Sequence, residues 1–425
     1  MRLGRRRLLA APLATCLLAA CGGLVPPVRL PGVTRKKQTV AFWFDQPAQL
    51  PAFQSFADVF AAARDDLELK TTVVPFTEVF PKLRAAAASD TAPDAVKTSG
   101  GSLGSVLANG PDGLAAALDK WDTRIGNTDW YKPIAEAVTR KGRVYAMPAT
   151  SGAVCLVWNK SLYQAAGLNP DAPPRTMDEL KAFAGKIAKP TADLWGHYSP
   201  YSPSFTGVLF AFGGRDVSDD SKVLVDQPEG IAALQWYLDL IKSRATPSDF
   251  MDPAAVVGDY AAGKVGSITI PPGYLTAVEK APFPSGLAPH PVARAAVAPV
   301  SFSVIVVCAR AQNPDGGWEF ARTVGLDPRW NIAWTQTYGS LPPRISVREA
   351  DAWKQHEQAH PLLIPFVDAQ KNGRVEYAGP GSFPFWATLG QEIAAAMQGK
   401  KSAAQAMHDA ATRAQGLIDS ARASG

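Results

Sequence analysis

Hydrophobic positions near the start of the chain change their spacing in a regular order, which predicts alternating strands and helices. Residues 39–45 form a short apolar run typical of a buried strand. Apolar residues then recur at three- and four-residue spacing between Phe53 and Phe60, as on one face of a helix. A second strand at 67–74 and a second helix at 79–88 repeat the order. This alternation predicts a doubly wound α/β lobe.

The segment from Gly142 to Lys189 carries the clearest local signals in the chain. Val154–Trp158 is apolar throughout, which predicts a largely buried strand. A short helix is predicted at 161–166, with Gly167 at its end. Beyond a proline-rich link, Thr176-Met-Asp-Glu179 has the S/T-x-x-E pattern of a capping box, which predicts the start of a second helix.

This segment resembles the central signature of the extracellular solute-binding proteins of bacterial ABC importers. The resemblance is to the large sugar-binding family that includes the maltose- and glycerol-phosphate-binding proteins, where the signature reads roughly G-K-x-Y-G-x-P, a strand ending in Y-N-K, then A-G-L and P-x-T-W-x-E-L. The matching residues are Gly142-Arg-Val-Tyr145, Pro148, Trp158-Asn-Lys160, Ala166-Gly-Leu168 and Thr176-Met-Asp-Glu-Leu180. Trp158 replaces Tyr and Met177 replaces Trp, which keeps size and apolar character. With similar motifs at 313–320 and 339–344, the resemblance covers about residues 39–420.

A chain of 425 residues is too long for one compact core and suits two to three domains. The resemblance implies an α/β, two-lobe periplasmic-binding-protein fold (type II-like), with a hinge between the lobes and a ligand cleft between them. We expect an N-terminal lobe of 39–150 and about 310–345. The C-terminal lobe would then comprise 151–309 and about 346–425, and the Val154–Trp158 strand would be one of the segments that cross between them.

Residues 1–20 have the composition of a signal peptide. Their arginines precede an apolar core at 8–18, which is too short to span a bilayer permanently. Leu18-Ala-Ala-Cys21 resembles the bacterial lipobox, which implies that Cys21 is the lipidated N-terminus and that 21–38 is a lipid-anchored flexible tether. A plain cleaved signal peptide is the alternative, and Arg5-Arg-Arg-Leu-Leu9 also allows twin-arginine export. We therefore expect an exported protein, lipid-anchored to the outer face of the cytoplasmic membrane or in the periplasm.

The charge of the chain gives no reason to expect nucleic-acid binding. It has 43 basic and 38 acidic residues, and without the four arginines of residues 1–20 the counts are 39 and 38. Cys155 and Cys308 lie within apolar runs, so we expect two buried thiols. A disulfide between them is the alternative, because the expected compartment is oxidising.

A sugar presents hydroxyl groups at its edge and weakly apolar C–H faces, so its site needs flat aromatic rings together with polar groups. The candidate rings are Trp43, Tyr274, Trp334 and Tyr338; the family resemblance points to Tyr274 in particular, since a comparable strand there ends in a turn whose aromatic stacks on the sugar. Each ring has core packing as its alternative.

Polar candidates follow predicted strands or lie in predicted loops. The resemblance implies Asp45, Ser99 and Ser151 as cleft-facing positions, with a helix or turn cap as the alternative for Asp45. The positions of Arg344 and Arg374 distinguish between two classes of expected ligand, because a guanidinium in a closed cleft suits a phosphate. If Arg374 points inward, a phosphate-bearing polyol is favoured; if both arginines are surface or hinge residues, a neutral oligosaccharide is favoured.

One motif in the sequence is compatible with an enzymatic role. Gly100-Gly-Ser-Leu-Gly104 matches the G-x-S-x-G nucleophile elbow of α/β-hydrolases, with Ser102 as the nucleophile, but residues 94–99 before it lack the apolar strand that the elbow needs. The five histidines are scattered, and His356 and His360 share helical spacing without a third ligand. We expect no catalytic residues, no metal and no cofactor.

The sequence therefore predicts a monomeric substrate-binding lipoprotein of an ABC importer. It would capture a sugar, oligosaccharide or polyol-phosphate solute such as a glycerophosphodiester, and deliver it to the transmembrane subunits of an ABC permease. The alternatives are an exported serine hydrolase that uses Ser102, and a scaffold or sensor lipoprotein that kept the fold and lost transport.

Overall fold

The computed structural model describes residues 37–46, 49–107, 113–198, 201–248 and 253–423. The predicted signal peptide, Cys21 and nearly all of the predicted tether lie outside these residues. Within them, no helix has the length and apolar character required to cross a membrane.

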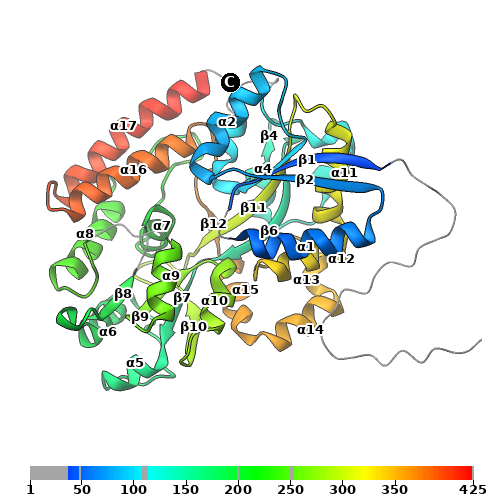
Figure 1. Cartoon of the computed structure of the whole chain (residues 1–425). Helices are drawn as coiled ribbons and strands as arrows, with labels where there is room; N and C mark the ends of the chain where they lie inside the picture. Colours follow the sequence, from blue (N-terminus) through cyan, green and yellow to red (C-terminus); the bar gives the residue numbers. More distant parts are fainter. Residues whose placement is uncertain (1–36, 47–48, 108–112, 199–200, 249–252, 424–425) are drawn as a thin grey trace, which may run out of the picture. The chain divides into compact units, whose positions relative to one another are not determined.

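The first sheet contains the strands predicted at the start of the chain (Figure 1). Its order is β12 (Arg374–Val375), β11 (Pro299–Val307), β3 (Ala95–Ser99), β1 (Gln38–Phe44) and β2 (Leu67–Val73), and β6 (Met147–Ala153) also pairs with β11. β1 lies parallel to β2 and β3, whereas β11 runs antiparallel to β3 and β6. The carboxyl ends of β1 and β3 therefore meet at one edge of this sheet.

Helices bury their apolar faces against this sheet and against one another. Phe42 and Phe44 of β1 are fully buried, as are Phe53 and Phe60 of the following helix. This is the helical face that the spacing of 53–60 predicted. The helices of this region are α1 (Leu50–Ala63), α2 (Phe76–Ala88), α3 (Leu103–Leu107), α4 (Lys132–Val138), α11 (Pro314–Leu326) and α12 (Pro328–Thr337), and β4 (Thr139–Arg140) pairs with β5 (Arg143–Val144).

The second sheet has the order β10 (Ser285–Pro289), β7 (Cys155–Asn159), β9 (Val265–Ile270) and β8 (Trp195–Tyr198). β7 is the buried strand predicted at Val154–Trp158, and all five of its residues are buried. The capping box is also present: the Thr176 hydroxyl accepts from the Glu179 N–H at 3.1 Å, and a Glu179 carboxylate oxygen accepts from the Thr176 N–H at 3.2 Å. Around this sheet lie α5 (Lys160–Ala165), α6 (Met177–Ile187), α7 (Tyr201–Ala211), α8 (Pro228–Lys242), α9 (Pro253–Ala261) and α10 (Leu275–Glu279).

The chain crosses from the first sheet to the second with one residue between strands. β6 ends at Ala153 and β7 begins at Cys155, and the intervening Val154 donates its N–H to the carbonyl oxygen of Pro299 at 2.9 Å. Pro299 is the first residue of β11, which brings the chain back into the first sheet. The two crossings are therefore hydrogen-bonded to each other, as expected for the paired connections of a hinge.

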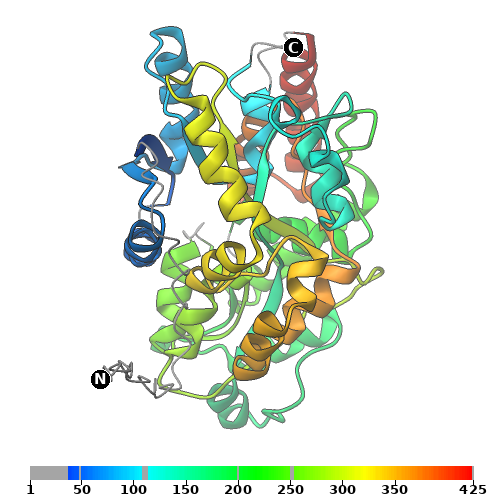
Figure 2. The same cartoon turned by 90° about the vertical axis from the view of Figure 1, so that its right-hand side faces the viewer.

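The C-terminal part of the chain packs on the second set of helices. α16 (Ser382–Met397) and α17 (Ala403–Ala423) lie side by side (Figures 1 and 2), and their buried residues share a core with α7 and α8. The helices α13 (Ile345–Glu349), α14 (Asp351–Ala359) and α15 (Ile364–Lys371) share a core with β7 and β9. The lobe boundaries given above stay a prediction, and the cores cross them: β11, within the expected C-terminal lobe, packs in the core of the first sheet, whereas Ile332 and Leu341 pack in the core of the second.

The two cysteines of the described body are separate. Cys155 lies on β7 in the second sheet, whereas Cys308 directly follows β11 in the first sheet, and both are buried free thiols. Burial raises the pKa of each thiol well above its usual value. The expectation of two buried thiols is therefore confirmed, and the disulfide alternative is wrong.

Candidate functional site

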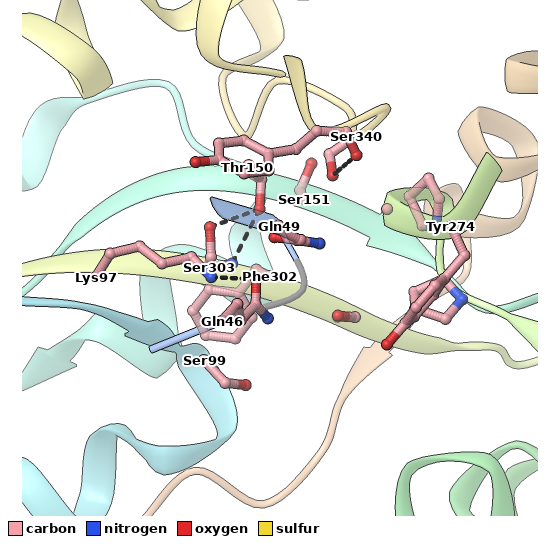
Figure 3. A pocket seen from close by; sticks show the side chains of 15 residues that line it. Gln46, Gln49, Lys97, Ser99, Thr150, Ser151, Tyr274, Phe302, Ser303 and Ser340 are labelled. Carbon is pink, nitrogen blue, oxygen red and sulfur yellow. Dashed lines mark hydrogen bonds between the residues drawn. The ribbon is translucent and has the colours of Figure 1, made fainter. Parts of the chain in front are cut away.

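A polar pocket of about 580 Å³, including its part open to solvent, lies where the two sheets approach each other (Figure 3). One wall comes from β3, β6 and β11 and from the loops that follow β1 and α12. The other wall is the turn that follows β9, which contains the short helix η6 (Pro272–Tyr274). The lining residues are Gln46, Gln49, Lys97, Ser99, Thr150, Ser151, Pro271, Pro272, Gly273, Tyr274, Ser301, Phe302, Ser303, Tyr338 and Ser340.

The hydroxyl groups of the pocket are supplied by neighbouring strands. Thr150 on β6 and Ser303 on β11 are register partners, and their hydroxyl oxygens lie 2.7 Å apart. Ser151 donates to the carbonyl oxygen of Pro342 at 3.0 Å, which holds the segment after α12 against β6. Ser99 at the end of β3 is half-buried on the same wall. This wall therefore offers short polar side chains fixed by a sheet, which suits the hydroxyls of a small polar molecule.

The pocket wall contains one charged side chain, Lys97, and its charge is compensated. Its ammonium donates to Asp45 Oδ1 at 3.2 Å, and the side chains of both residues are almost fully buried. It also donates to Gln46 Oε1 and lies 5.2 Å from the centre of the Phe44 ring. Burial lowers the pKa of Lys97, while the charge of Asp45 acts against that change. The pair gives the pocket no net charge.

The aromatic surface of the pocket comes from both walls. Tyr274 on η6 is half-buried, and Figure 3 shows its ring across the pocket from Lys97. Tyr338 and Phe302 line the other wall and are 5% and 4% exposed. Tyr274 thus offers the more accessible ring to a solute.

Four of the residues predicted from the sequence line this pocket: Ser99, Ser151, Tyr274 and Tyr338. Their roles as ligand contacts stay predictions. Asp45 lies directly behind the wall, where it is 1% exposed and holds Lys97.

Two tryptophans proposed as stacking rings, Trp334 and Trp43, do not line this pocket. Trp334 is 0% exposed and packs edge-on against Phe53 and Phe56, so its ring cannot contact a solute. Trp43 is half-buried on β1, packs against the core of the first sheet and is not among the lining residues.

The two discriminating arginines have structural partners outside the pocket wall. Arg344 donates to Asp129 Oδ1 at 2.8 Å and to the carbonyl oxygen of Leu326 at 2.7 Å. Arg374 donates to the carbonyl oxygen of Gly214 at 3.2 Å, and its guanidinium lies over a phenylalanine ring of α7. Neither is a lining residue, which is the arrangement that we expected for a neutral solute.

Sequence reasoning missed most of the polar wall, including Gln46, Gln49, Lys97, Thr150 and Ser303. A lysine within the strand that follows Asp94 was the available signal, because a charged residue in a buried strand requires a partner. The threonine and serines had no such signal, since single hydroxyl residues are common in strands and loops.

The G-x-S-x-G motif has a packing explanation. A Cβ atom at Gly100 would lie 2.1 Å from the Phe302 ring, and one at Gly104 would lie 1.6 Å from the carbonyl oxygen of Gly379. Ser102 between them is 4% exposed, and within the described ranges no histidine hydrogen-bonds to it. The same part of the chain contains no group of three or more metal-ligating side chains that could hold an ion.

The chain was compared with known protein families and curated proteins. Residues 55–361 match the family described as bacterial extracellular solute-binding protein. A maltotriose-binding protein of Pyrococcus abyssi is 25% identical over 310 residues, which cover 68% of this chain and 63% of that protein. The chain therefore spans less than two thirds of the length of this relative.

Solved structures share the fold over nearly the whole described body. One is an ABC-transporter solute-binding protein of Thermotoga lettingae bound to α-D-tagatose, with a TM-score of 0.79 and 21% identity over 90% of this chain and 100% of that chain. Another is the GacH receptor of Streptomyces glaucescens, described unliganded and with acarbose, with a TM-score of 0.78 and 23% identity over 90% and 99% of the two chains. At these identities the similarity establishes a two-lobe α/β fold.

Proposed function

The chain belongs to the family of bacterial extracellular solute-binding proteins, and on this basis we propose that it captures a neutral sugar or oligosaccharide in the pocket between its two sheets. The observation that carries the proposal is the composition of the pocket. Hydroxyl and amide side chains cover one wall, Tyr274 offers a ring on the other, and the charge of Lys97 is balanced by Asp45. Such a surface suits a molecule with many hydroxyl groups and no charge.

The relatives support a carbohydrate as the class of solute. Those named above are described with maltotriose, tagatose or acarbose. A glycerophosphodiester is less suited to this pocket, because both arginines that could bind a phosphate are used elsewhere.

Binding would close the two lobes around the solute. The lining residues come from segments on both sides of the β6–β7 crossing, so a bound solute contacts both walls and stabilises the closed form relative to the open form. The closed protein would then deliver the solute to the transmembrane subunits of an ABC permease. Export as a lipoprotein anchored through Cys21, and action as a monomer, belong to the same proposal.

Isothermal titration calorimetry on the mature protein, carrying Cys21→Ser to prevent lipidation, tests this proposal. The panel comprises maltose, maltotriose, tagatose and a glycerophosphodiester. We expect saturable binding of at least one neutral carbohydrate and none of the phosphodiester. Binding of the phosphodiester alone, or of no carbohydrate, would contradict the proposal.

A further inference from the structure

Three buried polar groups converge at the end of the pocket that lies against β1. Asp45 Oδ2 is buried and has no hydrogen-bond partner among the described residues, and the same holds for the Tyr338 hydroxyl. Lys97 has three N–H donors, and described side chains accept two of them. This corner of the pocket therefore contains an acceptor, a hydroxyl and a donor whose hydrogen-bonding capacity is not used.

These groups are neighbours that share the ring of Phe44. The Lys97 ammonium lies 5.2 Å from the centre of that ring, and the Tyr338 ring stacks on it at 6.3 Å. Burial raises the pKa of Tyr338, and the negative charge of Asp45 raises it further, so the phenol keeps its proton at neutral pH. Both Lys97 and Tyr338 line the pocket, so this corner borders the space that a solute would occupy, while the Asp45 and Tyr338 oxygen atoms themselves are buried.

Unused buried polar groups destabilise a folded protein unless another molecule supplies their partners. An occupant of this corner must donate to Asp45 Oδ2 and accept from Lys97 or Tyr338. A hydroxyl group does both at once, and two adjacent hydroxyls on a ring can contact all three groups. A phosphate or carboxylate oxygen could accept from Lys97, but it would lie beside the carboxylate of Asp45 and would be repelled.

We propose that Asp45, Lys97 and Tyr338 form a subsite for a pair of adjacent hydroxyl groups, in which Asp45 makes Lys97 a hydroxyl donor and prevents it from binding anions. This inference rests on the proposed carbohydrate-binding function and specifies its selectivity. In Figure 3, Lys97 and Gln46 lie on the opposite side of the pocket from Tyr274. The hydroxyl pair would thus be held at one end of the solute while Tyr274 contacts the ring face at the other.

Single substitutions separate the two parts of this proposal. Lys97→Met removes the donor, and we expect it to weaken binding of the neutral carbohydrate by about tenfold or more. Asp45→Asn removes the negative charge. We expect the same loss for the neutral carbohydrate together with measurable affinity for its uronic acid or phosphate derivative, which the unsubstituted protein does not bind. Lys132→Met is a matched control, because the Lys132 side chain is 87% exposed and does not line the pocket.

Titration calorimetry on each variant, with circular dichroism to check folding, gives the result. If both variants fold and bind the neutral carbohydrate within twofold of the unsubstituted protein, the subsite is refuted while the carbohydrate-binding function stands. If the unsubstituted protein binds no carbohydrate, both proposals fail together. If the variants do not fold, the affinity of the unsubstituted protein for monodeoxy analogues of the bound sugar tests the subsite. Removing the hydroxyl at either of two adjacent positions should weaken binding about tenfold. Equal affinity for every monodeoxy analogue would overturn the subsite.

Discussion

Glu376 links the protonation of one half-buried carboxyl group to the stability of the fold. The residue follows β12, and its carboxylate accepts a hydrogen bond from the hydroxyl of Thr206 on α7. Thr206 itself is 0% exposed. Burial raises the pKa of Glu376 to about 8; the hydrogen bond from Thr206 acts to lower it, and the nearby charge of Asp216 raises it further. The folded protein therefore keeps a proton on Glu376 at pH values where the unfolded chain has lost it.

The sign and size of the effect follow from this difference in proton binding. The folded-state pKa lies above the ordinary value of 4.5, so the stabilisation is fully present below pH 4.5 and is lost as the pH rises through about 8. For one group with these two pKa values, the free energy of unfolding falls by about 2.7 kcal/mol between pH 6 and pH 9. Glu376→Gln keeps the shape and a hydrogen-bond acceptor for Thr206 but does not titrate.

Urea denaturation at pH 6, 7, 8 and 9, followed by tryptophan fluorescence, measures the effect. We expect the stability of the unsubstituted protein to fall relative to that of Glu376→Gln across this range, by up to the amount given above. Glu136→Gln is the control, because the Glu136 side chain is 64% exposed, and it should follow the unsubstituted protein. Parallel stability curves for the unsubstituted protein and Glu376→Gln would refute the reasoning.

Three further substitutions or reagents test the packing. Gly104→Ala would place a methyl group 1.6 Å from a backbone carbonyl oxygen of the loop before α16. We therefore expect urea denaturation to show a free energy of unfolding lower by about 2 kcal/mol or more. Gly126→Ala is the control, because a methyl group there has no neighbour within 4 Å and should show no steric penalty. Trp334→Ala should cost about 3 to 5 kcal/mol because the whole ring is buried, and a loss below about 1 kcal/mol would contradict its core position. Cys155 and Cys308 should react with a thiol reagent only on unfolding, and a reductant should leave the unfolding midpoint unchanged; rapid labelling of the native protein would contradict their burial.

Local signals in the sequence identified the elements that depend on local chemistry. The capping box depends on Thr176 and Glu179 alone, and the buried strand β7 is visible as an unbroken apolar run. The strand order could not be obtained in the same way. β11 pairs with β3 and β6 through contacts between residues far apart in the chain, and no local pattern records such a pairing.

The error at Trp334 has a physical reason that the sequence already contained. Trp330, Trp334 and Tyr338 recur every four residues along and just beyond α12, so they lie along one helix face. That stripe packs against the phenylalanines of α1, and only its last member, Tyr338, reaches the pocket. The helical spacing of these rings therefore favoured core packing, the alternative stated for Trp334.

The role of Lys97 depends on a contact that no local pattern encodes. Its partner Asp45 lies 52 residues earlier, at the end of a different strand. The two residues meet because β1 and β3 are parallel neighbours, with Phe44 opposite Lys97 in the register. Asp45 was selected from the family resemblance, but its pairing with Lys97 required the strand order.

The position of β11 also constrains the order of events when the polypeptide is made. This strand fills the gap between β3 and β12 and supplies the edge on which β6 pairs, yet it is synthesised long after β1, β2 and β3. Until residues 299–307 emerge, β3 keeps an unpaired side, and such an edge is prone to join with other chains. Assembly of the first sheet must therefore wait for distant sequence, which slows folding and leaves the nascent chain open for longer.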